Sequence, residues 1–273
     1  MAQSAKWIAL AREAGLAAEH IAIGVTALGK ANYAQHAYYG QAFFALAIGF
    51  ERATKLALLV DYALLNNGKF PANKYILRYG HDLKSLLIQV DKIAMQRNIH
   101  DGWGKLPRSQ IHDGIIGSLN DFATNITRYY NLDLVTDSAK HDDPIKAWFD
   151  QVTLPVLDKH YTDRRKNRDT QNARLIESLL SEYSKVRFHD ESGRLLDSLF
   201  EGAMQTSITE FAKPFTRMYV MQICRFLGIV LSELGRAAMP DLEEIPYFGD
   251  FFAMYYNEDK YFKRRKTWSI YSL

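Results

Sequence analysis

Two basic segments in the C-terminal half carry side chains suited to binding a polyanion. The first contains Lys159, His160, Arg164, Arg165, Lys166 and Arg168, and the second contains Lys260, Lys263, Arg264, Arg265 and Lys266 among the rings of Tyr261, Phe262 and Trp268. Cationic groups contact phosphates while aromatic rings stack on unpaired bases. We therefore predict an RNA or single-stranded DNA interface, although each segment taken alone also suits a solvated helix face. Its candidate residues are Arg164, Arg165, Lys166, Arg168, Lys263, Arg264 and Arg265.

The histidines suggest a second chemistry. Five of the eight are followed directly by an aspartate: His81, His100, His112, His141 and His189. Imidazole and carboxylate groups bind divalent ions that activate water for phosphate-ester hydrolysis. The order of His81, His112 and Asp113, with Asp163 or Asp169, is similar to that in metal-dependent phosphohydrolases of the HD type. The segment after the pair reads IHDGIIG, without the lysine usual there. We keep this function as an alternative and predict no metal site and no cofactor.

Composition limits the class of protein. Of 273 residues, 48% are hydrophobic and 24% charged, which is typical of a globular protein, and the net charge of +3 leaves nucleic-acid binding to local clusters. The single cysteine, Cys224, excludes an intrachain disulfide and is expected in the core. The most hydrophobic stretch, 41–65, contains four charged residues, and the N-terminus has no long apolar run. We predict a cytoplasmic protein outside the membrane.

Helical periodicity runs through nearly the whole chain and predicts an all-α fold. The expected helices span about 5–31, 33–65, 81–97, 109–130, 144–161, 169–186, 190–211 and 214–236. Asp82 is placed to cap the third helix, and Pro214 to open the last. The helix over 169–186 carries a clear apolar stripe on one face. The stripe comprises Leu175, Ile176, Leu179, Leu180 and Tyr183.

A polar stretch over 131–143, followed by Pro144, predicts a domain boundary. We expect a helical bundle over 1–135 and a helical C-terminal region over 136–273. The latter ends in an aromatic-rich tail from Pro240, which should dock on the bundle because large exposed apolar patches are unusual on monomers.

Three segments of the N-terminal half, roughly residues 10–135, resemble the HEPN superfamily of four-helix bundles. They read AYYGQAFFALAIGFERATKLALLV over 37–60, RYGHDLKSLL over 78–87 and FATNITRYYN over 122–131. Glu51 and Lys55 stand one turn apart, His81 opens the third helix together with Asp82 and Leu83, and Arg128 closes the fourth. The resemblance implies a HEPN-like four-helix core with a helical C-terminal extension.

In that superfamily the active members are metal-independent ribonucleases that often pair as dimers, and they carry a His four to six residues after the motif Arg. Here Arg128 takes the Arg position, but no His falls in that window, where Asp133 is a carboxylate that could accept a proton. The catalytic candidates are thus Arg128 and Asp133. The resemblance implies a homodimer with an RNA-linked role, either RNA binding or atypical RNA cleavage, in a bacterial defence or toxin system. A non-catalytic protein-interaction module is the remaining alternative.

Overall fold

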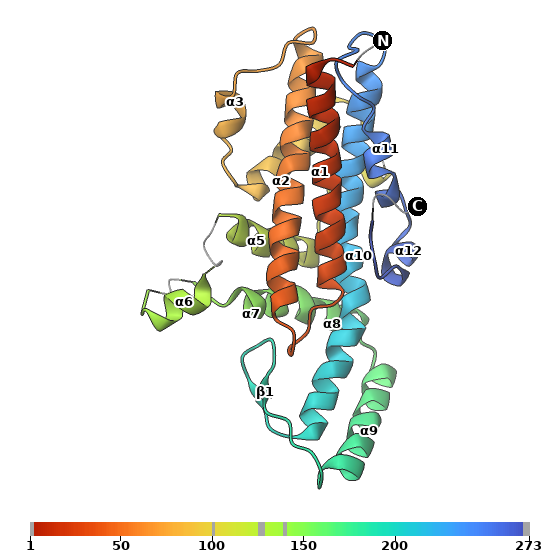
Figure 1. Cartoon of the computed structure of the whole chain (residues 1–273). Helices are drawn as coiled ribbons and strands as arrows, with labels where there is room; N and C mark the ends of the chain where they lie inside the picture. The colour runs from red at the N-terminus through yellow and green to blue at the C-terminus, as the bar shows by residue number, and fades with distance from the viewer. Residues whose placement is uncertain (1–2, 100–101, 125–128, 139–140, 270–273) are drawn as a thin grey trace.

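The computed structural model describes residues 3–99, 102–124, 129–138 and 141–269. The chain is 70% helical and 2% strand, which confirms the all-α prediction. Three long helices run side by side and form the body of the bundle (Figure 1): α1 (Ala5–Leu28), α2 (Ala37–Leu65) and α10 (Leu199–Ala238). The helices α4 (Leu83–Gln96) and α5 (Gln110–Ala123) pack against α2. Asp82 caps α4 as predicted, since its Oδ1 accepts a hydrogen bond from the backbone N–H of Ser85 at 3.0 Å.

Shorter elements complete the fold. Three helical segments follow one another from Pro144 to His160. These are α7 (Pro144–Trp148), a π-helical turn (Phe149–Thr153) and α8 (Leu154–His160). The others are α3 (Lys74–Leu77), a 3-10 turn (Gly102–Gly104), α6 (Tyr130–Val135), α9 (Asp163–Leu180), the antiparallel strands β1 (Phe188–His189) and β2 (Leu195–Leu196), α11 (Gly249–Phe252), a 3-10 turn (Ala253–Tyr255) and α12 (Asp259–Arg264).

The observed α10 differs from the prediction at two helix boundaries. The segment expected to begin a helix at 190 forms a hairpin instead, and α10 begins after Ser198, whose Oγ accepts a hydrogen bond from the N–H of Glu201 at 3.1 Å. The predicted break at Pro214 is also wrong, because α10 continues through it. Proline costs a helix interior about 3 kcal/mol, a local penalty that the largely buried apolar surface of this helix outweighs. By length and composition α10 could cross a membrane, but 83% of its most apolar window is buried within the protein.

One hydrophobic core contains residues from both sides of position 135. The division into domains over 1–135 and 136–273 stays a prediction. The aromatic tail docks on the bundle as expected, and its most deeply buried members include Phe248, Phe252, Tyr255 and Phe262. The hydroxyl of Tyr255 donates a hydrogen bond to the carbonyl oxygen of Ala18 at 2.6 Å. Cys224 is fully buried, as predicted.

One predicted stripe is not in the core. The helix α9 packs on α10 through a face that includes Asp169 and Ala173, and the apolar side chains from Leu175 to Tyr183 remain 39–82% exposed. No described part of the chain therefore covers this apolar face. Periodicity identified the apolar face of α9 correctly, but α9 packs on α10 through a neighbouring face.

Close packing of α1 on α2 depends on Gly49. A β-carbon at this position would lie 2.9 Å from the backbone nitrogen of Ile21 and 3.1 Å from the carbonyl oxygen of Ala17. We expect Gly49→Ala to lower the free energy of unfolding by about 1–3 kcal/mol, measured by urea denaturation, because the helices must move apart. The matched control is Gly40→Ala on the same helix, where a β-carbon meets nothing within 4 Å and helix propensity should improve. Equal effects of the two substitutions would contradict this packing.

Candidate functional site

An aromatic row lies along one face of α10. Phe211, Phe215 and Tyr219 recur at four-residue intervals, which places their side chains above one another on the helix. The rings of Phe211 and Phe215 are 5.2 Å apart between centroids. Phe211 and Phe215 are partly exposed, whereas Tyr219 is only 4% exposed.

The first basic segment folds onto this row. The imidazole of His160 stacks on Phe215 with centroids 4.2 Å apart and planes inclined by 15°, and its Nε2 lies 2.9 Å from the Tyr219 hydroxyl. The Lys159 ammonium lies 5.4 Å from the centre of the Tyr219 ring. Cations over aromatic faces are favoured by the ring quadrupole, so these contacts hold positive charge beside the row.

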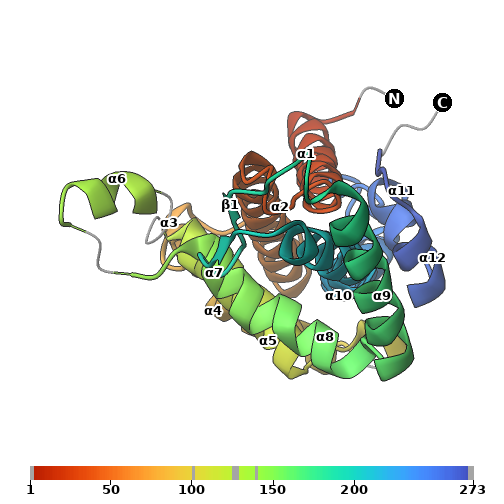
Figure 2. The same ribbon diagram turned by 90° about the horizontal axis from the view of Figure 1, so that it is seen from below.

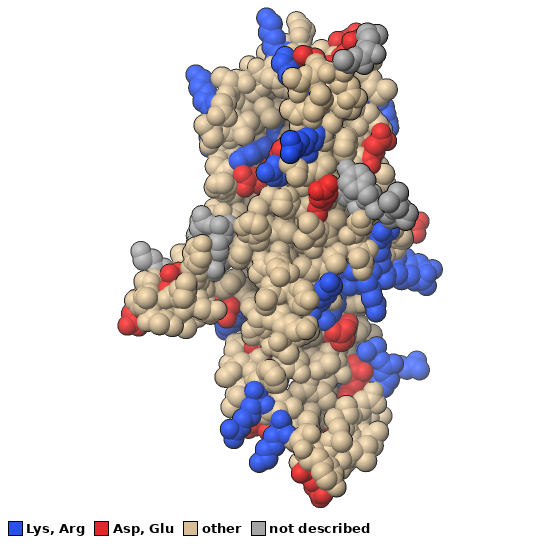
Figure 3. All heavy atoms as spheres, viewed as in Figure 1, with Lys and Arg blue, Asp and Glu red and all other residues tan. Residues whose placement is uncertain are grey.

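The second basic segment meets the same row from α12. The Lys263 ammonium lies 5.3 Å from the centre of the Phe215 ring. Two segments far apart in the sequence thus share one aromatic side chain. We define the basic–aromatic surface as Phe211, Phe215, Tyr219, Lys159, His160, Arg165 and Lys263. Figure 3 shows Lys and Arg side chains gathered on this side of the molecule, over α12 and the start of α9.

The other residues predicted to bind nucleic acid differ in their exposure and in whether they form ion pairs. Arg164, Lys166 and Arg264 are exposed and make no ion pair with any described residue. Arg165 lies 5.6 Å from the centre of the Phe211 ring, but its Nε also pairs with Asp169 at 2.7 Å.

Two arginines are engaged elsewhere. Arg168 contacts Asp169 at 3.4 Å, and Arg265 packs over Tyr261 and Trp268. Burial opposes ionisation of Asp169, but hydrogen bonds from Arg165 and Tyr161 prevail and lower its pKa. This carboxylate therefore stays charged and cancels part of the positive charge of α9.

His160 can change the charge of the surface. Burial lowers the pKa of its imidazole, and the nearby charges of Lys159 and Lys263 lower the pKa further. Since the ordinary histidine pKa is 6.5, His160 is neutral at physiological pH and gains a proton only on acidification. At neutral pH its contribution to the surface is a flat ring rather than a cation.

A second candidate is a pocket of about 500 Å³ beside α2, which we name the Glu51 pocket. The Glu51 carboxylate is 18% exposed and pairs with Lys55 Nζ at 2.7 Å and with His81 Nδ1 at 2.9 Å. Arg52 pairs with Glu13 at 2.7 Å. Glu51 on α2 therefore contacts both Lys55 and His81, three of the residues that carry the HEPN resemblance. The pocket is lined by Glu13, Phe44, Ala47, Ile48, Glu51, Arg52, Lys55, His81 and Ala123.

The Glu51 cluster should make stability depend on acid pH. Burial alone would raise the pKa of Glu51, but hydrogen bonds from Lys55 and His81 outweigh burial and hold the pKa below 4.5. A depressed pKa contributes stability above the unfolded-state pKa, and that contribution is lost as pH falls through the folded-state pKa. We expect wild type to exceed Glu51→Gln by about 0.5–1 kcal/mol in free energy of unfolding at neutral pH, because solvent screens the exposed imidazole of His81 in this cluster. The measurement is urea denaturation over pH 2–7, where the difference should shrink in acid; a pH-independent difference would contradict the assignment.

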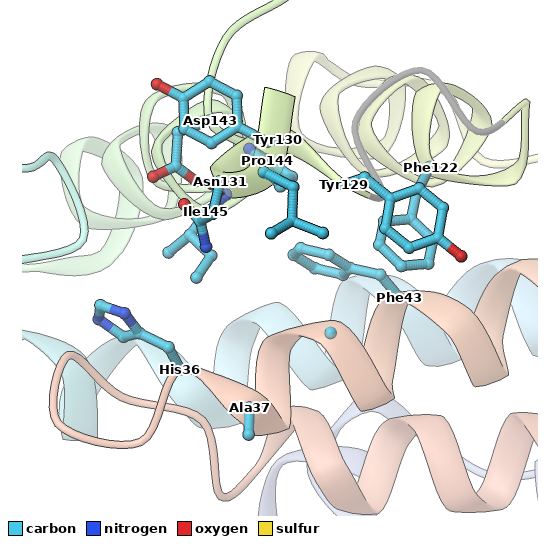
Figure 4. Close-up of a pocket in the computed structure, with 12 residues that line it drawn as sticks. His36, Ala37, Phe43, Phe122, Tyr129, Tyr130, Asn131, Asp143, Pro144 and Ile145 are labelled. Atoms are coloured by element: carbon cyan, nitrogen blue, oxygen red, sulfur yellow. Dashed lines mark hydrogen bonds between the residues drawn. The ribbon is translucent and has the colours of Figure 1, made fainter. Parts of the chain in front are cut away.

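Of the two predicted catalytic residues, Arg128 and Asp133, the structure describes Asp133. Arg128 lies outside the described residues, so its role stays a prediction. Asp133 lies half-buried on α6, and its side chain makes no hydrogen bond or ion pair with the described residues. A pocket of about 380 Å³ lies nearby, between the start of α2 and the segments around α6 and α7, but Asp133 does not line it. Figure 4 shows Phe43 extending from α2 into this pocket, where its ring centroid lies 5.8 Å from that of Phe122.

The metal ligands of the phosphohydrolase alternative are not brought together. His112 is 5% exposed, with Nδ1 2.8 Å from Ser109 Oγ and Nε2 2.8 Å from Gln222 Oε1. Asp113 points to solvent on α5, and His81 belongs to the Glu51 pocket. Among the described residues, no group of three or more His, Cys, Asp or Glu side chains could hold a metal ion.

Sequence reasoning found both basic segments but missed the aromatic row between them. Phe211, Phe215 and Tyr219 are visible in the sequence at helical spacing, yet the break expected at Pro214 would have divided them between two helices. Searches against protein-family models, curated proteins and solved structures found no match to this chain.

Proposed function

We propose that this protein binds single-stranded RNA through the basic–aromatic surface. The observation that carries the proposal is the meeting of two separate basic segments on Phe215, with His160 stacked on this ring and Lys263 beside it. Non-specific single-strand binding combines cations that follow the phosphates with rings that accept bases. The surface offers both within one patch.

The arrangement favours a single strand over a duplex. Bases in a duplex are stacked on each other and cannot reach the partly exposed rings of Phe211 and Phe215. Cations near the row, including Lys159 and Lys263, are available to neutralise phosphates on either side of a stacked base. Exposed Arg164, Lys166 and Arg264 extend the positive charge beyond the row.

The test is fluorescence anisotropy with a labelled oligouridine, titrated over a range of salt concentrations. We expect binding whose logarithmic salt dependence has a slope of about −0.7 for each neutralised phosphate. A duplex of the same length should bind more weakly, since only its phosphates are available. The absence of binding at low salt, or equal affinity for the duplex, would contradict the proposal.

A second candidate function is metal-independent RNA cleavage at the Glu51 pocket. Ionised Glu51 can only accept hydrogen bonds, so its 2.9 Å contact with His81 requires Nδ1 to be the donor. In the neutral tautomer this leaves Nε2 of an exposed imidazole free to accept a proton. Lys55 and Arg52 supply positive charge beside it.

Cleavage is tested with a quenched fluorescent RNA in the presence of EDTA. We expect His81→Gln to reduce the cleavage rate by about 10²–10⁴-fold, the contribution of a general acid or base. His189→Gln, at an exposed position on the hairpin, is the matched control. An inactive wild type, or equal rates for wild type and His81→Gln, would rule out this candidate and leave the binding proposal unaffected.

A further inference from the structure

The C-terminal part of α9 and the turn that follows it present a large apolar face to solvent. Its exposed fractions are 58% for Leu175, 39% for Ile176, 63% for Leu179, 47% for Leu180 and 82% for Tyr183. Leu175, Ile176, Leu179 and Leu180 lie on adjoining turns of α9, and Tyr183 lies in the turn after the helix ends at Leu180. Large contiguous apolar patches of this kind mark interaction sites on soluble proteins.

The described part of the chain leaves this face uncovered. Figure 1 shows α9 at the lower end of the molecule, beside α10, and Figure 2 views the molecule from this end. In the space-filling view, the surface over the C-terminal part of α9 is largely free of charged side chains, whereas Lys and Arg side chains lie near its start (Figure 3). The helix therefore combines a basic first part with an apolar second part.

We infer that this α9 face binds the same face of a second copy of the chain, with the two helices antiparallel about a two-fold axis near Leu179. From their exposed fractions, the five side chains present on the order of 600 Å² per protomer, so complete burial of this face in both copies would cover on the order of 1,200 Å² in total, the lower bound for a specific interface. An isologous contact needs one patch that is complementary to itself. A face without charged groups meets that requirement.

The spacing and charge of α9 support this geometry. On α9, Leu175 and Leu179 stand four residues apart, as do Ile176 and Leu180, which is the spacing of the ridges through which packed helices interdigitate. A parallel pair would bring the Arg164 and Lys166 side chains of both copies together. In an antiparallel pair about an axis near Leu179, Arg164 of each copy lies about 22 Å from the axis, so the two basic starts are on the order of 45 Å apart. Repulsion therefore selects the antiparallel arrangement.

Oligomeric state is tested by sedimentation velocity on the full chain without RNA. We expect a wild-type dimer at micromolar concentrations and at least a 100-fold weaker dimer for Leu179→Glu, with an unchanged circular dichroism spectrum because Leu179 is exposed. The matched control, Leu132→Glu on α6, changes an equally exposed leucine (66%) and should leave the dimer intact. A monomeric wild type, or a dimer unaffected by Leu179→Glu, overturns the inference. Binding of the monomer to anionic lipid vesicles through this face also overturns it.

The antiparallel geometry has its own test. Cys224 is fully buried, so a cysteine introduced on α9 would be the only reactive thiol among the described residues. Under mild oxidation, Leu179→Cys near the axis should form an intermolecular disulfide, while Asn167→Cys near the helix start should not. Crosslinking of Asn167→Cys in preference to Leu179→Cys would overturn the proposed arrangement.

Discussion

Reversing the charges of Lys159 and Lys263 together is expected to weaken single-stranded RNA binding by about 100-fold at low salt. Each ammonium belongs to a different basic segment, and each lies beside the aromatic row, at 5.4 Å from the Tyr219 ring centre and 5.3 Å from the Phe215 ring centre. If both contact phosphates, the salt-dependence slope should become smaller in magnitude by about 1.4, which is 0.7 for each lost contact on a single strand. Fluorescence anisotropy over a range of salt concentrations measures both quantities.

The matched control for this pair is the double variant Lys69→Glu and Lys74→Glu. It changes net charge by the same amount at two exposed positions near α3, away from the α9 and α12 side of the molecule (Figure 1). Its RNA affinity should fall only slightly, through the weaker overall field. Equal losses for the two double variants would mean that net charge, and not the basic–aromatic surface, governs binding.

Phe215→Leu is expected to weaken RNA binding by about 5- to 100-fold without changing the salt slope. Base stacking on an aromatic ring contributes about 1–3 kcal/mol per base, and leucine retains apolar packing while removing the flat ring. The loss should be uniform across salt concentrations because no phosphate contact changes. The measurement is the same titration, and a reduced slope would show that Phe215 acts by positioning Lys263.

The control for the ring is Phe188→Leu. Phe188 is 50% exposed on β1 and contacts Tyr33, with ring centroids 6.0 Å apart. It is a partly exposed phenylalanine outside the basic–aromatic surface, so its loss should leave RNA affinity unchanged. Equal losses for the two substitutions would contradict a specific stacking role for Phe215.

Much of the fold could be predicted because its signals are local. Helical periodicity identified most helices, Asp82 was recognised as a cap from its position, and the aromatic tail was expected to dock because its rings are too numerous to leave in water. Glu51 and Lys55, noted in the sequence as one helical turn apart, form an ion pair in the structure.

The remaining features depend on long-range packing. Pro214 is a local signal to end a helix, but the buried surface of α10 overrides it. The apolar stripe from Leu175 to Tyr183 has the right period, yet period does not say which surface covers it. In the same way, composition located both basic segments, but only the packing of α8 and α12 beside α10 brings His160 and Lys263 to Phe215.

Photocrosslinking with an oligonucleotide that contains 4-thiouridine tests the central claim most directly. Mass spectrometry of the crosslinked peptides should find RNA attached within both 159–168 and 260–266, and on the α10 segment that contains Phe211 and Phe215. Crosslinks in both basic segments of the same protein would mean that a single strand runs across the surface. Crosslinks confined to one segment, or concentrated around the Glu51 pocket instead, would contradict the proposed interface.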